Sequence, residues 1–383
     1  MKSLVRIVFS GLLAAAVSGC GLWGDSGEEV QPTPLVTFEP EKTVEVLWSV
    51  SVGSGPGSKY HQIQPAIDGD SIFAVDRDGT VTGFALATGE KVWEVELGLP
   101  VVGGVGAGSG KVAIASEEGE IVVLSSEDGS ELWRETVSSE VSSAPQFNNQ
   151  LAVFQLINGK VVAFEAATGK RLWTFDTLIP RLTLRGTSSP VVASDVTFAG
   201  FSNGKLVAID NVKGSRLWES RVALPSGRSE LERMVDVDGK PMLVEKMLYV
   251  SSYQGRLVAI NPFNAQIVWS QDVSSYRSLA SGFGNVYVSE SNDAVQAFDR
   301  RTSASVWRQV SLENRRITSP VAISNEVAVG DYEGYVHFMS QTDGHFVARH
   351  KVDSSGLNGD MLVSDGVLYV LGNSGRLSAL SLK

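Results

Sequence analysis

The chain has 383 residues, of which 43% are hydrophobic and 20% are charged, as is usual for a globular protein with a core. The formal net charge of −11 argues against a general nucleic-acid-binding protein, because binding to phosphates requires a basic surface. The single cysteine excludes a disulfide bond within the chain, so packing alone must stabilise the fold.

The first predicted element is an export signal. Lys2 and Arg6 precede an apolar run at residues 7–17, and small residues then lead to Cys20. This order is typical of a secretory signal peptide, and the run is shorter than the roughly 20 residues that span a bilayer. The ending VSGC resembles a bacterial lipobox, which implies that residues 1–19 are removed and that Cys20 carries lipid. The alternatives are an ordinary signal peptide with a chance cysteine and an uncleaved anchor.

Residues 20–42 are predicted to be a flexible, lipidated tether. They are rich in Gly, Pro and Glu and have no regular hydrophobic period. Gly21 follows Cys20, and by resemblance to lipoprotein sorting signals a residue other than aspartate favours the outer membrane. We therefore expect the folded domain at the periplasmic face of the outer membrane, attached through the lipid.

A repeat of about 40 residues occupies the rest of the chain. Eight turn signals align at Gly79, Gly119, Gly159, Gly204, Gly255, Asp293, Gly334 and Gly375. Adding fourteen to the first seven positions gives Trp93, Trp133, Trp173, Trp218, Trp269, Trp307 and Ala348. Strands rich in β-branched residues alternate with these turns, and the period is that of a four-stranded propeller blade. The pattern predicts an all-β, eight-bladed β-propeller of antiparallel blades with tryptophans packed between them, and Ala348 predicts a weaker seventh blade.

The two ends of the repeat region are complementary. The eighth unit begins its last hairpin at Gly375, but the chain ends at residue 383, before a tryptophan strand is reached. Residues 43–52, around Trp48, look like a tryptophan strand without a preceding blade. We predict that residues 43–52 pair with residues 376–383, so that the N-terminal strand closes the ring and the propeller spans residues 43–383.

The repeats FALATGEKVW and FEAATGKRLW resemble those of pyrroloquinoline-quinone-type propellers. Within this group, the lipobox, the eight units and the segments PRLTLRGTSSP (180–190) and RSELERMVDVDGKP (228–241) resemble the BamB family of lipoproteins. The resemblance implies a non-catalytic scaffold in the machinery that assembles outer-membrane β-barrel proteins, bound to its barrel subunit BamA and to other subunits. It also implies that BamA is contacted by Leu182, Leu184, Arg185, Asp236 and Asp238.

Both segments lie where the spacing between tryptophans stretches to 45 and 51 residues, just before Pro190 and Pro241. They are therefore expected to be neighbouring loops at one rim, where binding residues often gather. Asp236 and Asp238 are expected to hold the loop of Arg185 by charge-assisted hydrogen bonds. The alternatives are long loops without a partner and a solvated arginine.

Other functions are less well supported by the residues. A quinone-dependent dehydrogenase is the main alternative because its repeats are similar, but no loop offers a recognisable calcium site and the only cysteine is Cys20. Asp236 and Asp238 as an acid–base pair, and the four scattered histidines as metal ligands, are less expected than structural roles. We predict no cofactor, metal or catalytic residue. Binding of unfolded outer-membrane proteins at blade edges stays open.

Overall fold

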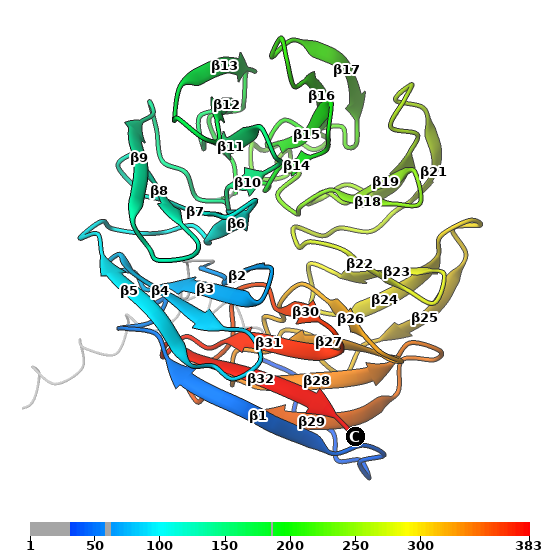
Figure 1. Cartoon of the computed structure of the whole chain (residues 1–383). Helices are drawn as coiled ribbons and strands as arrows, with labels where there is room; N and C mark the ends of the chain where they lie inside the picture. Colours follow the sequence, from blue (N-terminus) through cyan, green and yellow to red (C-terminus); the bar gives the residue numbers. More distant parts are fainter. Residues whose placement is uncertain (1–30, 58–62, 185–186) are drawn as a thin grey trace, which may run out of the picture. The chain divides into compact units, whose positions relative to one another are not determined.

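The structure, a computed structural model, describes residues 31–57, 63–184 and 187–383. Within these ranges every regular element is a β-strand. The strands form eight four-stranded antiparallel sheets that follow one another around a ring (Figure 1). This arrangement confirms the predicted all-β, eight-bladed propeller. Cys20 and Arg185 lie outside the described residues.

The first four blades follow the order of the chain. Blades 1 and 2 comprise β2 (Ala66–Asp68), β3 (Ser71–Val75), β4 (Thr80–Ala85), β5 (Lys91–Glu96), β6 (Gly106–Gly108), β7 (Lys111–Ala115), β8 (Glu120–Ser125) and β9 (Glu131–Thr136). Blades 3 and 4 comprise β10 (Gln146–Phe147), β11 (Leu151–Gln155), β12 (Lys160–Glu165), β13 (Arg171–Asp176), β14 (Val191–Val192), β15 (Val196–Phe201), β16 (Lys205–Asp210) and β17 (Arg216–Arg221).

The remaining blades continue around the ring. Blades 5 and 6 comprise β18 (Met242–Val244), β19 (Met247–Val250), β20 (Leu257–Ile260), β21 (Ile267–Gln271), β22 (Ala280–Gly282), β23 (Asn285–Ser289), β24 (Val295–Asp299) and β25 (Ser305–Gln309). Blade 7 comprises β26 (Val321–Ile323), β27 (Glu326–Gly330), β28 (Tyr335–Ser340) and β29 (Phe346–Lys351). Blade 8 comprises β30 (Leu362–Ser364), β31 (Val367–Leu371), β32 (Arg376–Leu382) and β1 (Val44–Ser51).

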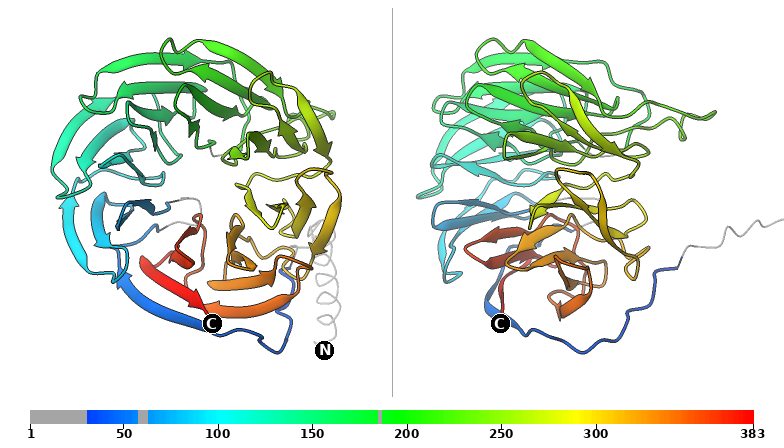
Figure 2. Two further views of the ribbon diagram at one scale, coloured as in Figure 1. Left: turned by 45° about the vertical axis from the view of Figure 1, so that its right-hand side comes forward. Right: turned by 90° about the vertical axis from the view of Figure 1, so that its right-hand side faces the viewer.

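The first strand of each blade lies near the centre of the ring and the last lies at the outside (Figure 2). The middle strands carry the core because both of their faces pack against neighbouring blades; β11, for example, is buried along its whole length. Chain direction alternates from strand to strand, so the blades share two rims. We name the rim that carries the connections between consecutive blades the loop rim, and the opposite rim the turn rim.

The chain closes the ring with its first strand. β1 pairs with β32 from Val44 opposite Leu382 to Ser51 opposite Arg376, with an irregularity between Val46 and Trp48. Thr43 and Lys383 also exchange backbone hydrogen bonds of 3.0 Å in both directions. The predicted pairing of the two ends is confirmed. It gives blade 8 its fourth, outer strand, so that β32 is not left as an exposed edge.

Seven tryptophans fasten a blade to the next one; among the described residues, blade 7 alone has no such contact with its successor. Each indole N–H donates a hydrogen bond of 2.7–3.1 Å to a backbone carbonyl in the last hairpin of the following blade. The pairs are Trp48–Leu86, Trp93–Ser126, Trp133–Ala166, Trp173–Asn211, Trp218–Pro262, Trp269–Arg300 and Trp307–Gln341. The constant offset in the sequence therefore reflects a contact that repeats from blade to blade.

Glycine in this hairpin makes room for the indole of the preceding blade. A Cβ atom at Gly169, whose φ is +73°, would lie 2.7 Å from the ring of Trp133. Two blades replace this glycine, and there Ala265 and Ser303 adopt φ angles of 61° and 62°. The left-handed backbone is thus kept even where the residue is not glycine.

Blade 7 is complete although it lacks a tryptophan. Ala348 stands opposite Phe338 in the register that Trp173 has opposite Ala163. In blade 8 no hairpin joins β32 to β1, because the chain ends there and the partner strand comes from the other terminus. A tryptophan at position 348 would therefore have no such hairpin to pack on. Its absence follows from the closure, and the weaker seventh blade stays a prediction.

The compact unit that contains the propeller begins at Thr33, earlier than the predicted start at residue 43. Residues 33–42 lie along blade 7 and form backbone hydrogen bonds to Glu313 and Val347. A Gly- and Pro-rich composition indicated a tether, but these long-range contacts hold the second half of that segment on the propeller.

Candidate functional site

Two long loops meet on the loop rim beside blade 4. The first long loop (177–190) joins β13 to β14, and the second long loop (222–241) joins β17 to β18. The second extends well beyond the blades in the side view (Figure 2). As expected, each loop ends at the proline that precedes an inner strand, Pro190 or Pro241.

Hydrogen bonds connect the two loops directly. The backbone N–H of Leu184 donates to the Asp236 carboxylate, and the Ser188 hydroxyl donates to the carbonyl of Gly239 at 3.1 Å. The second loop is also fixed to the hairpin between β15 and β16, since Val235 forms a bridge with Asn203. The structure therefore brings together four of the five predicted site residues: Leu182, Leu184, Asp236 and Asp238.

These residues differ in what they present to solvent. Leu182 is 37% exposed, Leu184 is half-buried, and the side chain of Asp236 is completely buried. Leu182 can be contacted from outside the molecule. Asp236 instead positions the backbone of the first long loop from beneath.

The two aspartates lie in surroundings that disfavour their charge. Burial raises the pKa of Asp236 to about 6, and the hydrogen bond from Leu184 only partly offsets this effect. Burial, and then the neighbouring charge of Asp236, raise the pKa of Asp238 well above its usual range. Among the described residues, none donates a hydrogen bond to the Oδ1 atom of either side chain. A cation close to the first long loop would stabilise the charged forms of these two acids.

A small cavity lies at the base of the first long loop. Its volume is about 10 Å³, and its lining includes Gln155, Thr187 and Asp238. This is room for about one water molecule, which could serve the buried oxygen atoms there.

Three further leucines on these two loops are exposed and were not predicted. Leu178, Leu224 and Leu231 are 92%, 65% and 62% exposed. The carbonyl of Leu178 accepts a hydrogen bond from Asn203, and that of Leu231 accepts one from Gln254, so both residues are held against hairpins of blades 4 and 5. Their position inside otherwise polar insertions was the feature of the sequence that could have indicated their exposure. Together with Leu182 they are four exposed leucines on the two loops, which we name the leucine rim.

Polar side chains cross the centre of the ring. The Lys240 ammonium group of blade 5 donates to Gln146 of blade 3 at 2.7 Å, and the Ser278 hydroxyl donates to Asp360 of blade 8 at 3.0 Å. Burial lowers the pKa of Lys240. These bonds link blades that are not neighbours and brace the inner strands against one another.

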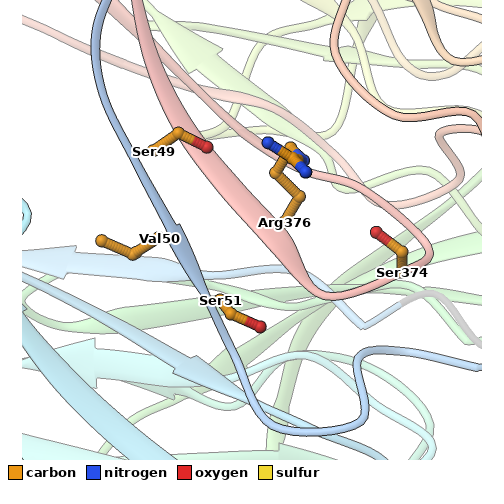
Figure 3. Close-up of a pocket in the computed structure, with 5 residues that line it drawn as sticks. All are labelled: Ser49, Val50, Ser51, Ser374 and Arg376. Atoms are coloured by element: carbon orange, nitrogen blue, oxygen red, sulfur yellow. The ribbon is translucent and has the colours of Figure 1, made fainter.

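Other candidate sites are modest. A polar pocket of about 240 Å³ opens at the closure between β1 and β32, lined by Ser49, Val50, Ser51, Ser374 and Arg376 (Figure 3). Over the described ranges, the structure contains no group of three or more His, Cys, Asp or Glu side chains arranged to hold a metal ion. In the same ranges no helix is long and apolar enough to cross a membrane.

Two of the four histidines have clear structural contacts. His337 is buried and lies 2.9 Å from Asp331, whereas His345 is exposed and bonds to Asp343 and Glu41. Each serves a structural contact of blade 7, while His61 lies outside the described residues.

Known proteins resemble both the fold and the sequence. The family model described as outer membrane protein assembly factor BamB matches residues 35–102 and 77–309. The protein of that name from Pseudomonas aeruginosa is 40% identical over 380 residues, which cover 99% of this chain and 100% of the relative.

Solved structures show the same architecture. The crystal structure of BamB from Moraxella catarrhalis has a TM-score of 0.82 at 24% identity and covers 88% of this chain and 100% of that one. A quinohemoprotein alcohol dehydrogenase from Comamonas testosteroni has a TM-score of 0.69 at 12% identity, covering 88% of this chain and 76% of that one. The dehydrogenase thus shares only the propeller fold. The relative from Pseudomonas aeruginosa, by contrast, matches this chain in sequence over its full length. The chain belongs to the family of the outer membrane protein assembly factor BamB.

Proposed function

We propose that this protein is a non-catalytic scaffold lipoprotein of the machinery that assembles β-barrel proteins in the outer membrane. Relatives that match the whole chain carry the name of an outer membrane protein assembly factor. The lipobox ending at Cys20 supports attachment to the outer membrane at its periplasmic face. The scaffold holds other subunits of the machinery in place and assists the folding and insertion of their clients.

The partner surface is formed by the two long loops, and its partner is BamA. The observation that carries this proposal is the contact between Leu184 and Asp236, which fixes two insertions as one surface with exposed leucines. Apolar side chains on a rigid base gain free energy when a partner removes them from water. Arg185 directly follows Leu184 in the sequence, and in this proposal it supplies a positive charge to the buried Asp236 and Asp238.

The role of each residue follows from its exposure. Leu182 contacts BamA directly, and Leu184 contacts it through the part of its side chain that remains accessible. Asp236 and Asp238 act on the partner through the conformation of the first long loop. Binding of unfolded outer-membrane proteins remains a second role, and it uses the outer edges of strands such as β5 and β9.

Affinity purification of the full-length lipoprotein from outer membranes tests this function. We expect a large β-barrel subunit to co-purify with the parent protein and to be lost with Arg185→Ala, while the circular dichroism of the variant stays that of a β-propeller. Purification of a chain with tightly bound quinone and without a barrel subunit would instead support the dehydrogenase alternative.

A further inference from the structure

The N-terminal segment packs on blade 7, the blade that has Ala348 where other blades have a tryptophan. Residues 33–42, which we name the N-terminal strap, lie along this blade between the loop rim and the turn rim. The amides of Glu41 and Lys42 both donate to the carbonyl of Val347, at 2.9 and 3.2 Å. These bonds lie next to Ala348, the position at which the series of tryptophans is interrupted.

Side chains of the strap continue the contact. Phe38 stacks on Phe346 with a distance of 5.6 Å between ring centroids and an interplanar angle of 26°. The guanidinium of Arg349 lies 5.0 Å from the centroid of the Phe38 ring. Lys42 forms an ion pair of 2.6 Å with Glu326, whose side chain is only 3% exposed. The strap therefore covers apolar surface and neutralises a buried carboxylate.

A network of charged side chains inside blade 7 holds in place the arginines that contact the strap. The buried Asp331 carboxylate accepts hydrogen bonds from Arg315 at 2.7 and 2.9 Å and lies 2.9 Å from His337. Arg349 donates to Nδ1 of His337 at 3.0 Å, so Nε2 of this ring carries the proton shared with Asp331. Burial lowers the pKa of His337, which agrees with a neutral imidazole.

Both arginines of the network hold the strap by its backbone. Arg315 donates to the carbonyl of Thr33 at 2.9 Å, and Arg349 donates to the carbonyl of Val36 at 3.0 Å. The strap carbonyls thus satisfy N–H groups of two cations that are otherwise committed inside the blade. Buried charged donors are costly to leave without acceptors, so this surface is built for a chain segment in an extended conformation.

The strap determines the rim at which the N-terminal segment leaves the propeller. Thr33 bonds to Glu313 in the connection between blades 6 and 7, and such connections lie on the loop rim. Thr43, at the other end, bonds to Lys383 beside the end of β32 on the turn rim.

We propose that blade 7 is a docking site for the N-terminal strap. The docked strap makes the chain leave the propeller toward its membrane anchor from the loop rim. Release of the strap would move the point of departure to Thr43 on the turn rim and would turn the leucine rim away from the membrane. This inference rests on the proposed lipid anchoring, but not on the identity of the partner.

Hydrogen exchange of the full-length protein in detergent tests the docking. We expect the amides of Glu41 and Lys42 to be protected in the parent and to exchange at least tenfold faster in Thr33→Pro/Phe38→Ala, which loses one donor and one ring. Amides of β28 should be unchanged, and the control Val36→Ala, which keeps its carbonyl, should behave as the parent. Exchange of residues 33–42 at the rate of an unstructured peptide in the parent would overturn the docking.

Energy transfer to acceptor-labelled lipids tests the orientation. Donor dyes are placed at Leu224→Cys on the loop rim or at Val212→Cys on the turn rim, two exposed positions of blade 4, in full-length protein on phospholipid vesicles. We expect stronger transfer from position 224, and loss or reversal of this preference in the strap variant.

Two results would overturn the orientation. One is equal transfer from both positions in the parent, and the other is an unchanged preference when hydrogen exchange shows that the strap is released. A chain that does not attach to vesicles would contradict the anchoring itself. Failure to bind BamA would leave both readouts unaffected, so the two proposals are separable.

Discussion

At the scale of residues, the buried acids below the first long loop are the most unusual feature. Asp236 is completely buried, and over the described ranges the only hydrogen bond to its carboxylate is the one from the Leu184 amide. A carboxylate in this position is held ionised only by a nearby cation, and the proposed function assigns that role to Arg185. The acids and the arginine are then one unit that shapes the partner surface.

Replacing Arg185 should make stability depend on pH. Burial gives Asp236 a folded pKa of about 6, above its unfolded value of about 4, and Arg185→Ala takes away the cation that we propose favours its charged form. The folded state then binds the proton more tightly, so the free energy of unfolding of Arg185→Ala should fall as pH rises from about 4 to about 6, by roughly 2 kcal/mol. Urea denaturation at a series of pH values measures this loss.

The double variant Arg185→Ala/Asp236→Asn is the control for that pH dependence. It removes the Asp236 carboxyl while keeping an oxygen for the Leu184 amide, so its profile should be less steep over this range, with the remaining slope due to the buried Asp238. Parallel profiles of Arg185→Ala and the parent would contradict the assignment of Arg185 as the cation.

At the scale of elements, one indole and one hairpin join each blade to the next, except between blades 7 and 8. The indole donates a hydrogen bond and fills the space above a residue with positive φ, so both partners of the contact are constrained. The sequence showed this contact as a fixed offset within a unit, although the contact itself links Trp133 to the hairpin of the following unit.

The glycine of this hairpin should be irreplaceable for a reason beyond backbone conformation. Gly169→Ala places a Cβ atom 2.7 Å from the Trp133 ring, whereas Gly110→Ala, at a similar φ of +77°, meets nothing within 4 Å. Both should lose about 1 kcal/mol through the left-handed backbone, and Gly169→Ala should lose about 1–3 kcal/mol more through overpacking. Equal thermal stability of the two variants would show that the indole contact is not tight.

Restoring the tryptophan of blade 7 should destabilise the protein. Ala348→Trp completes the series in the sequence, but blade 8 has no hairpin to receive the indole, and the strap occupies the neighbouring backbone. We expect a loss of about 1–3 kcal/mol in the free energy of unfolding and faster amide exchange in residues 33–42. A gain in stability would contradict the explanation given for Ala348.

At the scale of the whole molecule, closure by the N-terminal strand connects the ring to its anchor. The register of β1 against β32 was predictable because two partial units, at the two ends of one chain, add up to one blade. The N-terminal strap was not predictable, because residues 33–42 have no period and their partners, such as Glu313, are distant in sequence.

The candidate site was predicted only in outline. The longer spacings located the two loops, but burial of Asp236 and the exposure of Leu178, Leu224 and Leu231 depend on how the loops fold over neighbouring hairpins. The pairing of distant segments sets these properties, and periodicity within one segment carries no information about it.

Removing the closing strand should open the ring. Deletion of residues 43–52 leaves β32 as an exposed edge and removes the contact of Trp48 with blade 1. We expect the variant to form oligomers or aggregates, detected by light scattering after size-exclusion chromatography, and to melt at a lower temperature. A monomer with unchanged melting would contradict closure as the source of stability.

The binding of the propeller to the periplasmic domains of BamA tests the proposed surface most directly. Leu182→Ala/Leu184→Ala should weaken this binding at least tenfold, or about 1.4 kcal/mol, because the replaced side chains lie on the joined loops. The control Leu172→Ala changes a leucine that is 44% exposed on β13, away from the loops, and should change the Kd less than about twofold. Equal affinity of the double variant and the parent, with both folded, would contradict the account.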